Sequence, residues 1–170
     1  MIKPADLLFV SNQHEGMDDA IVASTGNYVH VALVVDDRHI IDASPKYGVA
    51  LRTLSDFLIT SPQPDIFRPR ITNQNQIVLK AKMFIGLPYN VSFYPEDKGM
   101  YCSEFITNVF KDTITFENQP LSFADGSQLI SNYWQHYFNK LGVPAPVGQN
   151  GSNPTAMAKN EYLDFIGKLK

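Results

Sequence analysis

The only cysteine in this chain of 170 residues, Cys102, lies in the stretch GMYCSEFITNVF at residues 99–110. Apolar residues from Phe105 to Phe110 follow it at the spacing of one buried helix face, which predicts that Cys102 begins an amphipathic helix. At a helix N-terminus, unpaired N–H groups and the positive end of the dipole stabilise a thiolate, the nucleophilic form of cysteine. The same position also suits a small apolar residue of the core. The residues around Cys102 therefore leave two interpretations, a nucleophile and an inert core thiol.

A cysteine nucleophile needs a base, and His30 is the histidine in the most unusual place. In the strand YVHVALVV it alternates with Tyr28 and Ala32 on one face. An ionisable ring on such an apolar strand is costly unless it has a polar partner, so a hydrogen-bonded core histidine is the competing interpretation. His39, on the following strand, is the alternative base.

The other two histidines are expected to be exposed. His14 lies in the polar segment SNQHEGMDD and is predicted to be a loop residue, although such loops can line sites. His136 lies off the apolar stripe of its predicted helix and is expected to be solvated.

A histidine base also needs a carboxylate or amide that fixes its tautomer, and Asp42 is the candidate. It follows Ile40 and Ile41 in HIIDASPKYG, so an acid stands where the strand is otherwise apolar. The alternative interpretation is a strand-end aspartate that turns the chain together with Ser44 and Pro45.

The turn between the two strands decides whether Asp42 can reach His30. A two-residue turn at residues 36–37 would place Ala43 opposite His30 and point Asp42 to the other face, and His39 would then share the face of His30. A three-residue loop with a bulge would place Asp42 directly opposite His30, about 5 Å away. A catalytic triad therefore predicts an odd-length or bulged turn.

The elements that position these residues are predicted as strands first and helices later. Runs rich in β-branched and aromatic residues predict strands at residues 6–10, 28–35, 38–44, 49–54 and 65–70. Periodicity and end signals predict helices within residues 72–86, 101–113 and 125–142, then a loop over 143–154 and a short helix opening at Pro154. This order favours an α+β fold, with an antiparallel sheet packed against helices in a single domain over residues 1–170.

Together these segments resemble the circularly permuted papain-like hydrolases of the NlpC superfamily, most closely the YiiX-like branch, with lecithin retinol acyltransferase as a more distant relative. The resemblance runs from about Asp6 to Phe110, and weakly to SNPTAMAKN; its motifs are ADLLF, YVHVALVV, IIDAS, GLPYN and YCSEF. In that family the histidine precedes the cysteine, the reverse of papain, and the order here is His30, Asp42, Cys102. The resemblance implies a permuted papain-like (NlpC-type) fold.

The resemblance also implies roles for individual residues. Cys102 would be the nucleophile, His30 the base and Asp42 the third polar residue, where the YiiX-like branch more often has Glu. A shorter acid can still reach the ring if the strands pair closely. The backbone N–H of Cys102 could bind the oxyanion of a tetrahedral intermediate.

The same resemblance implies an oxyanion and substrate groove around the nucleophile. Its expected members are Tyr101, Ser103, Tyr89, Asn90 and Tyr28. Asn90 stands where the family has Asp. The aromatic run NVSFYP is a candidate groove for an apolar acyl chain, with a core or lid segment as the alternative.

Composition excludes several function classes. The formal charge of −3, the pI near 5.7 and the scattered lysines and arginines argue against a nucleic-acid partner. No stretch reaches the roughly 18 apolar residues of a membrane span, and MIKPADLLFVSNQ lacks the features of a secretory signal. As written, the sequence predicts a cytoplasmic protein, or one of the cell envelope or secreted if a leader was removed. One cysteine excludes an internal disulfide, and no zinc-ligand spacing is present.

The predicted function is a thiol hydrolase that cleaves an amide through a cysteine acyl-enzyme, with no cofactor. By resemblance, the bond is a peptide, isopeptide or N-acyl amide in a small-molecule, peptide or lipid-like substrate. Two alternatives stay open: an acyltransferase that uses the same thioester, and a non-catalytic binding module with an inert cysteine. The sequence leaves the oligomeric state open.

Overall fold

A computed structural model describes the whole chain, residues 1–170, as eight strands and six helices. The strands are β1 (Leu7–Ser11), β2 (Tyr28–Val34), β3 (His39–Ser44), β4 (Gly48–Thr53), β5 (Asp65–Pro69), β6 (Gln119–Pro120), β7 (Asn150–Gly151) and β8 (Leu163–Lys168). The helices are α1 (Asp18–Thr25), α2 (Leu54–Thr60), α3 (Gln74–Met83), α4 (Cys102–Phe110), α5 (Asn132–Leu141) and α6 (Pro154–Ala158).

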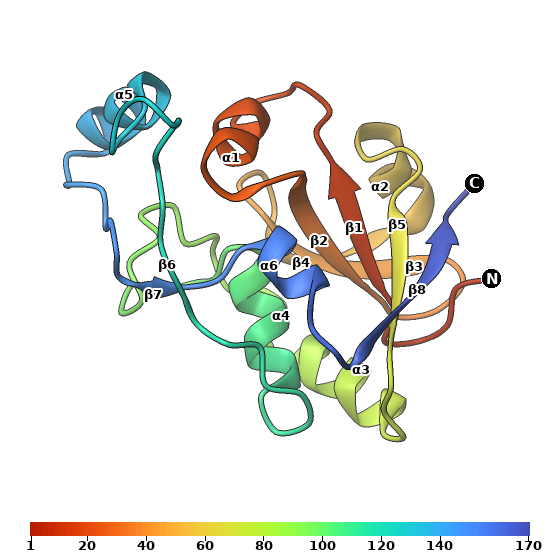
Figure 1. Cartoon of the computed structure of the whole chain (residues 1–170). Coiled ribbons are helices and arrows are strands. Elements are labelled where there is room, and N and C mark those ends of the chain that lie inside the picture. The colour runs from red at the N-terminus through yellow and green to blue at the C-terminus, as the bar shows by residue number, and fades with distance from the viewer.

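Six of the strands form one antiparallel sheet in the order β4-β3-β2-β1-β5-β8 (Figure 1). The short strands β6 and β7 pair separately. Helices and strands do not alternate regularly along the chain, and the large sheet is antiparallel, which confirms the predicted α+β fold. Because β2 and β3 lie inside the sheet, polar side chains on them enter the interior of the molecule.

The sheet separates two apolar clusters because alternate residues of each strand point to opposite faces. On one face, Leu7, Val31 and Ile41 share a cluster with Phe105 and Phe110 of α4. Helices α3 and α4 lie together on this side (Figure 1). This is the larger of the two clusters, so α4 is anchored along its whole apolar face.

The opposite face carries a smaller cluster beneath α2. Leu8, Ala32 and Ile40 pack there with Phe57 of α2, and all four are fully buried. Thr53 begins α2 by accepting a hydrogen bond from the N–H of the third helical residue. This face of the sheet also holds the polar residues described below.

Helix α5 lies apart from the sheet, on an excursion of the chain between α4 and α6 (Figure 1). Ser131 caps it by accepting a hydrogen bond from the N–H of Trp134 at 3.3 Å, and Gly142 ends it in the left-handed conformation at φ 81°. Trp134 and Phe138 project from α5 into an aromatic cluster with Phe123. Ring packing therefore fastens α5 to the rest of the molecule.

Five elements are not predicted by the sequence patterns: the helices α1 and α2, the two-residue strands β6 and β7, and the strand β8. The two helices are short and contain serine and threonine residues, which weaken helix propensity, and β8 is a mostly exposed edge strand. The helix predicted within residues 125–142 begins only at Asn132, because Asp125 accepts hydrogen bonds from the N–H groups of Ser127 and Gln128 and holds a turn. None of the six helices combines the length and the apolarity needed to cross a membrane.

Candidate active site

A β-bulge in β2 sets the orientation of His30. Val10 of β1 pairs with His30, but the next residue, Ser11, pairs with Tyr28, so Val29 is an extra residue in β2. His30 consequently lies near the α2 side of the sheet, whereas Tyr28 packs in the cluster beneath α4. The simple alternation that placed Tyr28 and His30 on one face is therefore wrong.

Asp42 is 1% exposed, and its Oδ2 lies 2.8 Å from Nε2 of His30. The turn between β2 and β3 contains three residues, 36–38, so the odd-length turn is confirmed and both side chains lie on one face. The expected direct pairing is wrong, because Leu33 pairs with Ile41, and in this register the position opposite Asp42 is Ala32 and not His30. The long imidazole ring spans the diagonal instead.

Arg52 of β4 completes a buried polar group on this face. Its Nε lies 3.6 Å from Oδ1 of Asp42, beyond a direct hydrogen bond, and its guanidinium lies over the rings of Phe57 and Tyr47. Arg52 and His30 thus face different oxygens of one carboxylate.

Cys102 is the first residue of α4, as predicted, and is 7% exposed. Glu104 fixes this end of the helix, because its Oε1 accepts hydrogen bonds from the N–H of Tyr101 and from Nδ2 of Asn90, both at 3.2 Å. Burial raises the pKa of Glu104 to about 7, and these two hydrogen bonds oppose the rise. The start of α4 is thereby tied to the GLPYN segment.

The thiol of Cys102 lies beside the imidazole of His30. Burial disfavours the charged ring, but the interactions of the ring with Asp42 and with the nearby Cys102 outweigh burial and raise the pKa of His30 to about 10. Since Nε2 is bound to Asp42, Nδ1 is the ring nitrogen that remains for Cys102. The ring is 20% exposed, so solvent reaches it from one side.

A cavity of about 360 Å³ opens onto this group. We call the residues from the strands and the start of α4 the polar wall: His30, Asp42, Arg52 and Cys102. We call a second part of the lining the aromatic wall: Phe93, Leu121, Phe123 and Trp134. The cavity thus joins an ionisable group to a large apolar surface.

Three of the expected groove residues line the cavity: Tyr89, Tyr101 and Ser103. The Tyr101 hydroxyl accepts a hydrogen bond from the N–H of Ser152 at 3.1 Å, and the hydroxyls of Ser152 and Ser103 lie 2.8 Å apart. A side chain on Gly151 would collide with the Tyr101 hydroxyl, so the chain passes close to the helix start only because this residue is glycine.

Two expected groove residues do not line the cavity. Tyr28 lies on the other side of the sheet and donates its hydroxyl proton to Asp65 at 2.5 Å. Asn90 is 1% exposed and donates to the carbonyl of Tyr94 and to Glu104, so it stabilises the loop beneath the cavity. The bulge in β2 and this buried loop explain both corrections.

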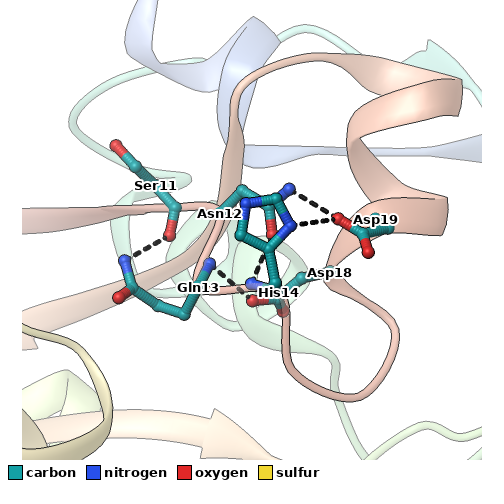
Figure 2. Close-up of polar contacts among 6 residues, drawn as sticks. All are labelled: Ser11, Asn12, Gln13, His14, Asp18 and Asp19. Carbon is teal, nitrogen blue, oxygen red and sulfur yellow. Dashed lines mark hydrogen bonds and ion pairs between the residues drawn. The ribbon is translucent and has the colours of Figure 1, made fainter.

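The remaining histidines lie outside the cavity lining. His39 pairs with Asp36 at 2.9 Å on an exposed turn. Figure 2 shows His14 turned toward Asp19, with Nδ1 2.8 Å from Oδ1. Hydrogen bonds among the polar residues of this loop hold its conformation. His136 is exposed on α5. His30 is therefore the one histidine beside Cys102.

Residues 1–167 match the family of permuted papain-like amidase enzymes described as YaeF/YiiX, C92. The chain belongs to this family. The resemblance noted in the sequence is thereby confirmed.

Among solved structures, the C92 chain resembles the crystal structure of metalloprotein yiiX from Escherichia coli O157:H7. The TM-score is 0.82 over 98% of this chain and 97% of that one, at 20% sequence identity, which establishes a shared fold. In this C92 chain no three His, Cys, Asp or Glu side chains gather in a group that could hold a metal ion, so we assign none. No curated protein sequence matches the chain.

Arg52 and Trp134 are site residues that the sequence patterns did not identify. Arg52 has a weak signal, because it is the one charge in the strand VALRTL and lies on the face of Asp42 once the hairpin register is known. Trp134 has none, because it fits the apolar stripe of its helix like an ordinary core residue.

Proposed function

We propose that this C92 protein is a cysteine amidase in which Cys102 is the nucleophile, His30 the base and Asp42 the residue that orients His30. One observation carries the proposal. Asp42 holds Nε2 of His30 at 2.8 Å and leaves the rest of the ring beside the thiol of Cys102, on the wall of a cavity that can admit a substrate. A nucleophile, a base and an orienting group in contact are the parts that acyl transfer requires.

The proton follows a short path in this mechanism. Because the raised pKa of His30 favours the imidazolium, Nδ1 of His30 holds the proton of the Cys102 thiol before the substrate binds, and the thiolate attacks the carbonyl carbon of the amide. The C–N bond breaks as the imidazolium gives the proton to the leaving amine, which leaves a thioester on Cys102. Water then gives a proton to His30 and attacks the thioester, and that proton remains on Nδ1 as the acid departs from the thiolate. Asp42 stabilises the imidazolium throughout.

The start of α4 suits the oxyanion of this reaction. The N–H of Cys102 belongs to the first turn of the helix, where backbone donors have no partner within the helix. Such a donor is available to the oxygen on which negative charge develops. Tyr101 and Ser103 hold the flanking backbone through their contacts with Ser152.

The lining of the cavity favours an N-acyl amide with an apolar acyl group. The aromatic wall supplies Phe93, Phe123 and Trp134 next to the polar wall. A hydrocarbon chain would gain about 0.8 kcal/mol for each CH₂ that it buries against such rings. A chain of this kind would occupy the aromatic wall while its carbonyl carbon lies at Cys102.

The test is to mix the protein with a decanoyl amide of an aminocoumarin, to follow release of the fluorescent amine and to weigh the acid-quenched protein by mass spectrometry. We expect release of the amine and an adduct equal to the acyl group minus one proton. Cys102→Ala should show neither, and His39→Gln, which alters a histidine outside the cavity, should behave as wild type.

A second readout covers the alternatives. Iodoacetamide should alkylate Cys102 readily near pH 6, where an ordinary thiol is scarcely ionised, and His30→Ala should slow it. Full turnover in Cys102→Ala would overturn the nucleophile. Slow alkylation together with no adduct from acyl amides or peptides would identify a binding module.

A further inference from the structure

The polar wall contains a cation that the proposed reaction does not use. Arg52 is the only lysine or arginine that lines the cavity, and its side chain is 15% exposed. Asp42 is the one acid with which it forms an ion pair. Because burying a charge is costly, a cation in this place requires an explanation.

The strand register and two aromatic rings fix the position of Arg52. In the ladder between β3 and β4, Asp42 pairs with Ala50, so Arg52 lies on the same face at the diagonal position. Its guanidinium carbon lies 5.6 Å from the ring centre of Phe57 and 5.1 Å from that of Tyr47. Phe57 is fully buried. Register and ring stacking therefore place the cation beside Asp42.

The two oxygens of Asp42 have different surroundings. Oδ2 lies 2.8 Å from Nε2 of His30, whereas Oδ1 has no hydrogen bond and faces Nε of Arg52 at 3.6 Å. The contact with Arg52 is therefore one of charge. Because the outer C–C bond of an aspartate turns easily, a carboxylate held at only one oxygen is poorly fixed. The cation thus supplies the second point at which Asp42 is held.

We propose that Arg52 is a positioning residue that acts on the thiolate through Asp42 and His30. Its charge holds Oδ1 of the carboxylate, Oδ2 then stays on the imidazole, and the imidazolium stays beside Cys102. This inference rests on the proposed function, because it concerns the thiolate that would attack the substrate. The charges agree with it: the carboxylate and the thiolate are balanced by the imidazolium and the guanidinium. A buried group of charges is least costly when each has its opposite.

No other cation can take this place. Outside the polar wall, the ionisable groups of the cavity lining, α2 and α4 are acids or phenols: Glu15, Asp18, Asp56, Tyr89, Tyr101 and Glu104. Lys46 also lies over the ring of Tyr47, at 5.1 Å, but it is exposed and does not line the cavity. Lys46→Gln is therefore the matched control for loss of a charge from the same ring.

The test measures alkylation of Cys102 by iodoacetamide at a series of pH values, which needs no substrate and reports the pH at which the thiolate forms. In Arg52→Gln this pH should rise by about one pH unit, because a poorly fixed carboxylate holds the imidazolium less well. On the acid side of the profile, kcat/KM for the decanoyl amide should be about 10-fold lower. Arg52→Lys, which keeps the charge, and Lys46→Gln should both stay within about 0.3 pH units of the wild type.

A double variant tests the path through Asp42. If Arg52 acts through this carboxylate, adding Arg52→Gln to Asp42→Asn should move the pH of thiolate formation by less than about 0.3 pH units. If Arg52→Gln fails to fold, Arg52→Met keeps an apolar stem against Phe57 and removes the charge, and the same rise of about one pH unit is expected of it.

The outcomes separate this inference from the proposed function. A rise in Arg52→Gln without any amide hydrolysis by the wild type would keep the inference and overturn the amidase. Hydrolysis by the wild type, together with thiolate formation at an unchanged pH in the uncharged Arg52 variants, would overturn the inference alone. A rise that is equally large in the Asp42→Asn background would overturn the path through Asp42.

Discussion

The two walls of the cavity are built in different ways. The polar wall takes His30, Asp42 and Arg52 from three adjacent strands, β2, β3 and β4, whose positions are set by backbone hydrogen bonds. The aromatic wall takes Phe123 and Trp134 from the long excursion that carries α5, where ring packing replaces a backbone ladder. One wall is therefore held by the main chain and the other by side chains.

This difference suits the roles that the proposed function gives to the two walls. Proton transfer requires atoms placed to within fractions of an ångström, and a strand ladder supplies that precision. An apolar chain can bind with less exact placement, because burial depends on area more than on direction. Substitutions in the polar wall should consequently lower turnover, and substitutions in the aromatic wall should change the choice of substrate.

The largest effect is expected from removing the proposed nucleophile or the proposed base. Cys102→Ala and His30→Ala should each lower kcat by about 10³-fold or more, and the double variant should be no worse than either single variant because the two residues act as a unit. Kinetics with the decanoyl amide checks this. Cys102→Ala should unfold at nearly the wild-type temperature, since a methyl group replaces a thiol. Strictly multiplied losses in the double variant would show that the residues act separately.

Asp42→Asn should have the next largest effect. The amide can still hold the ring of His30 but cannot stabilise its charge, so kcat should fall by about 10- to 1,000-fold. The matched control is Asp36→Asn, which alters the exposed partner of His39 in the same hairpin. Equal losses in the two variants would mean that the hairpin, and not the contact with His30, is what matters.

The polar wall should also make stability depend on pH. The pKa of His30 rises from 6.5 to about 10 on folding, so its contribution is fully present below about pH 6.5 and is lost as the pH rises through about 10. The free energy of unfolding of the wild type, minus that of His30→Gln, should fall by a few kcal/mol between these limits. Urea titrations at several pH values measure it. A difference that stays constant over this range would contradict the charged pair.

A smaller and more selective effect is expected in the aromatic wall. Phe123→Leu removes ring area next to Trp134 and should raise KM for the decanoyl amide by about 10-fold. An acetyl group offers little hydrocarbon to bury against this wall, so kcat/KM for the acetyl amide should stay within about twofold of the wild-type value. Equal losses on both substrates would show that the two walls are not independent.

The smallest effect is expected outside both walls. His14→Gln removes the contact with Asp19 in the loop of Figure 2, where both side chains are more than 70% exposed. Its stability should change by less than about 0.5 kcal/mol and its activity by less than about twofold. Thermal unfolding and the decanoyl assay check this. A large loss of activity would show that this loop contributes to the active site.

The sequence by itself determined the features that depend on near neighbours in the chain. The five first strands follow from β-branched and aromatic runs, and the helix at Cys102 from its apolar spacing. An odd number of residues in the turn between their strands places Asp42 and His30 on the same face of the sheet. The spacing of apolar residues and the odd or even length of a turn are local properties of the chain, so the sequence alone indicates them.

Only the tertiary structure decided the features that depend on distant segments. The bulge at Val29 exists because β1 and β2 pair with a shifted register, and it sends Tyr28 away from the cavity. Arg52 reaches Asp42 through a third strand. Trp134 becomes part of the cavity only when the α5 excursion packs against the rest of the molecule. Each depends on contacts across the fold, whose free energy comes from packing and pairing partners that no local pattern specifies.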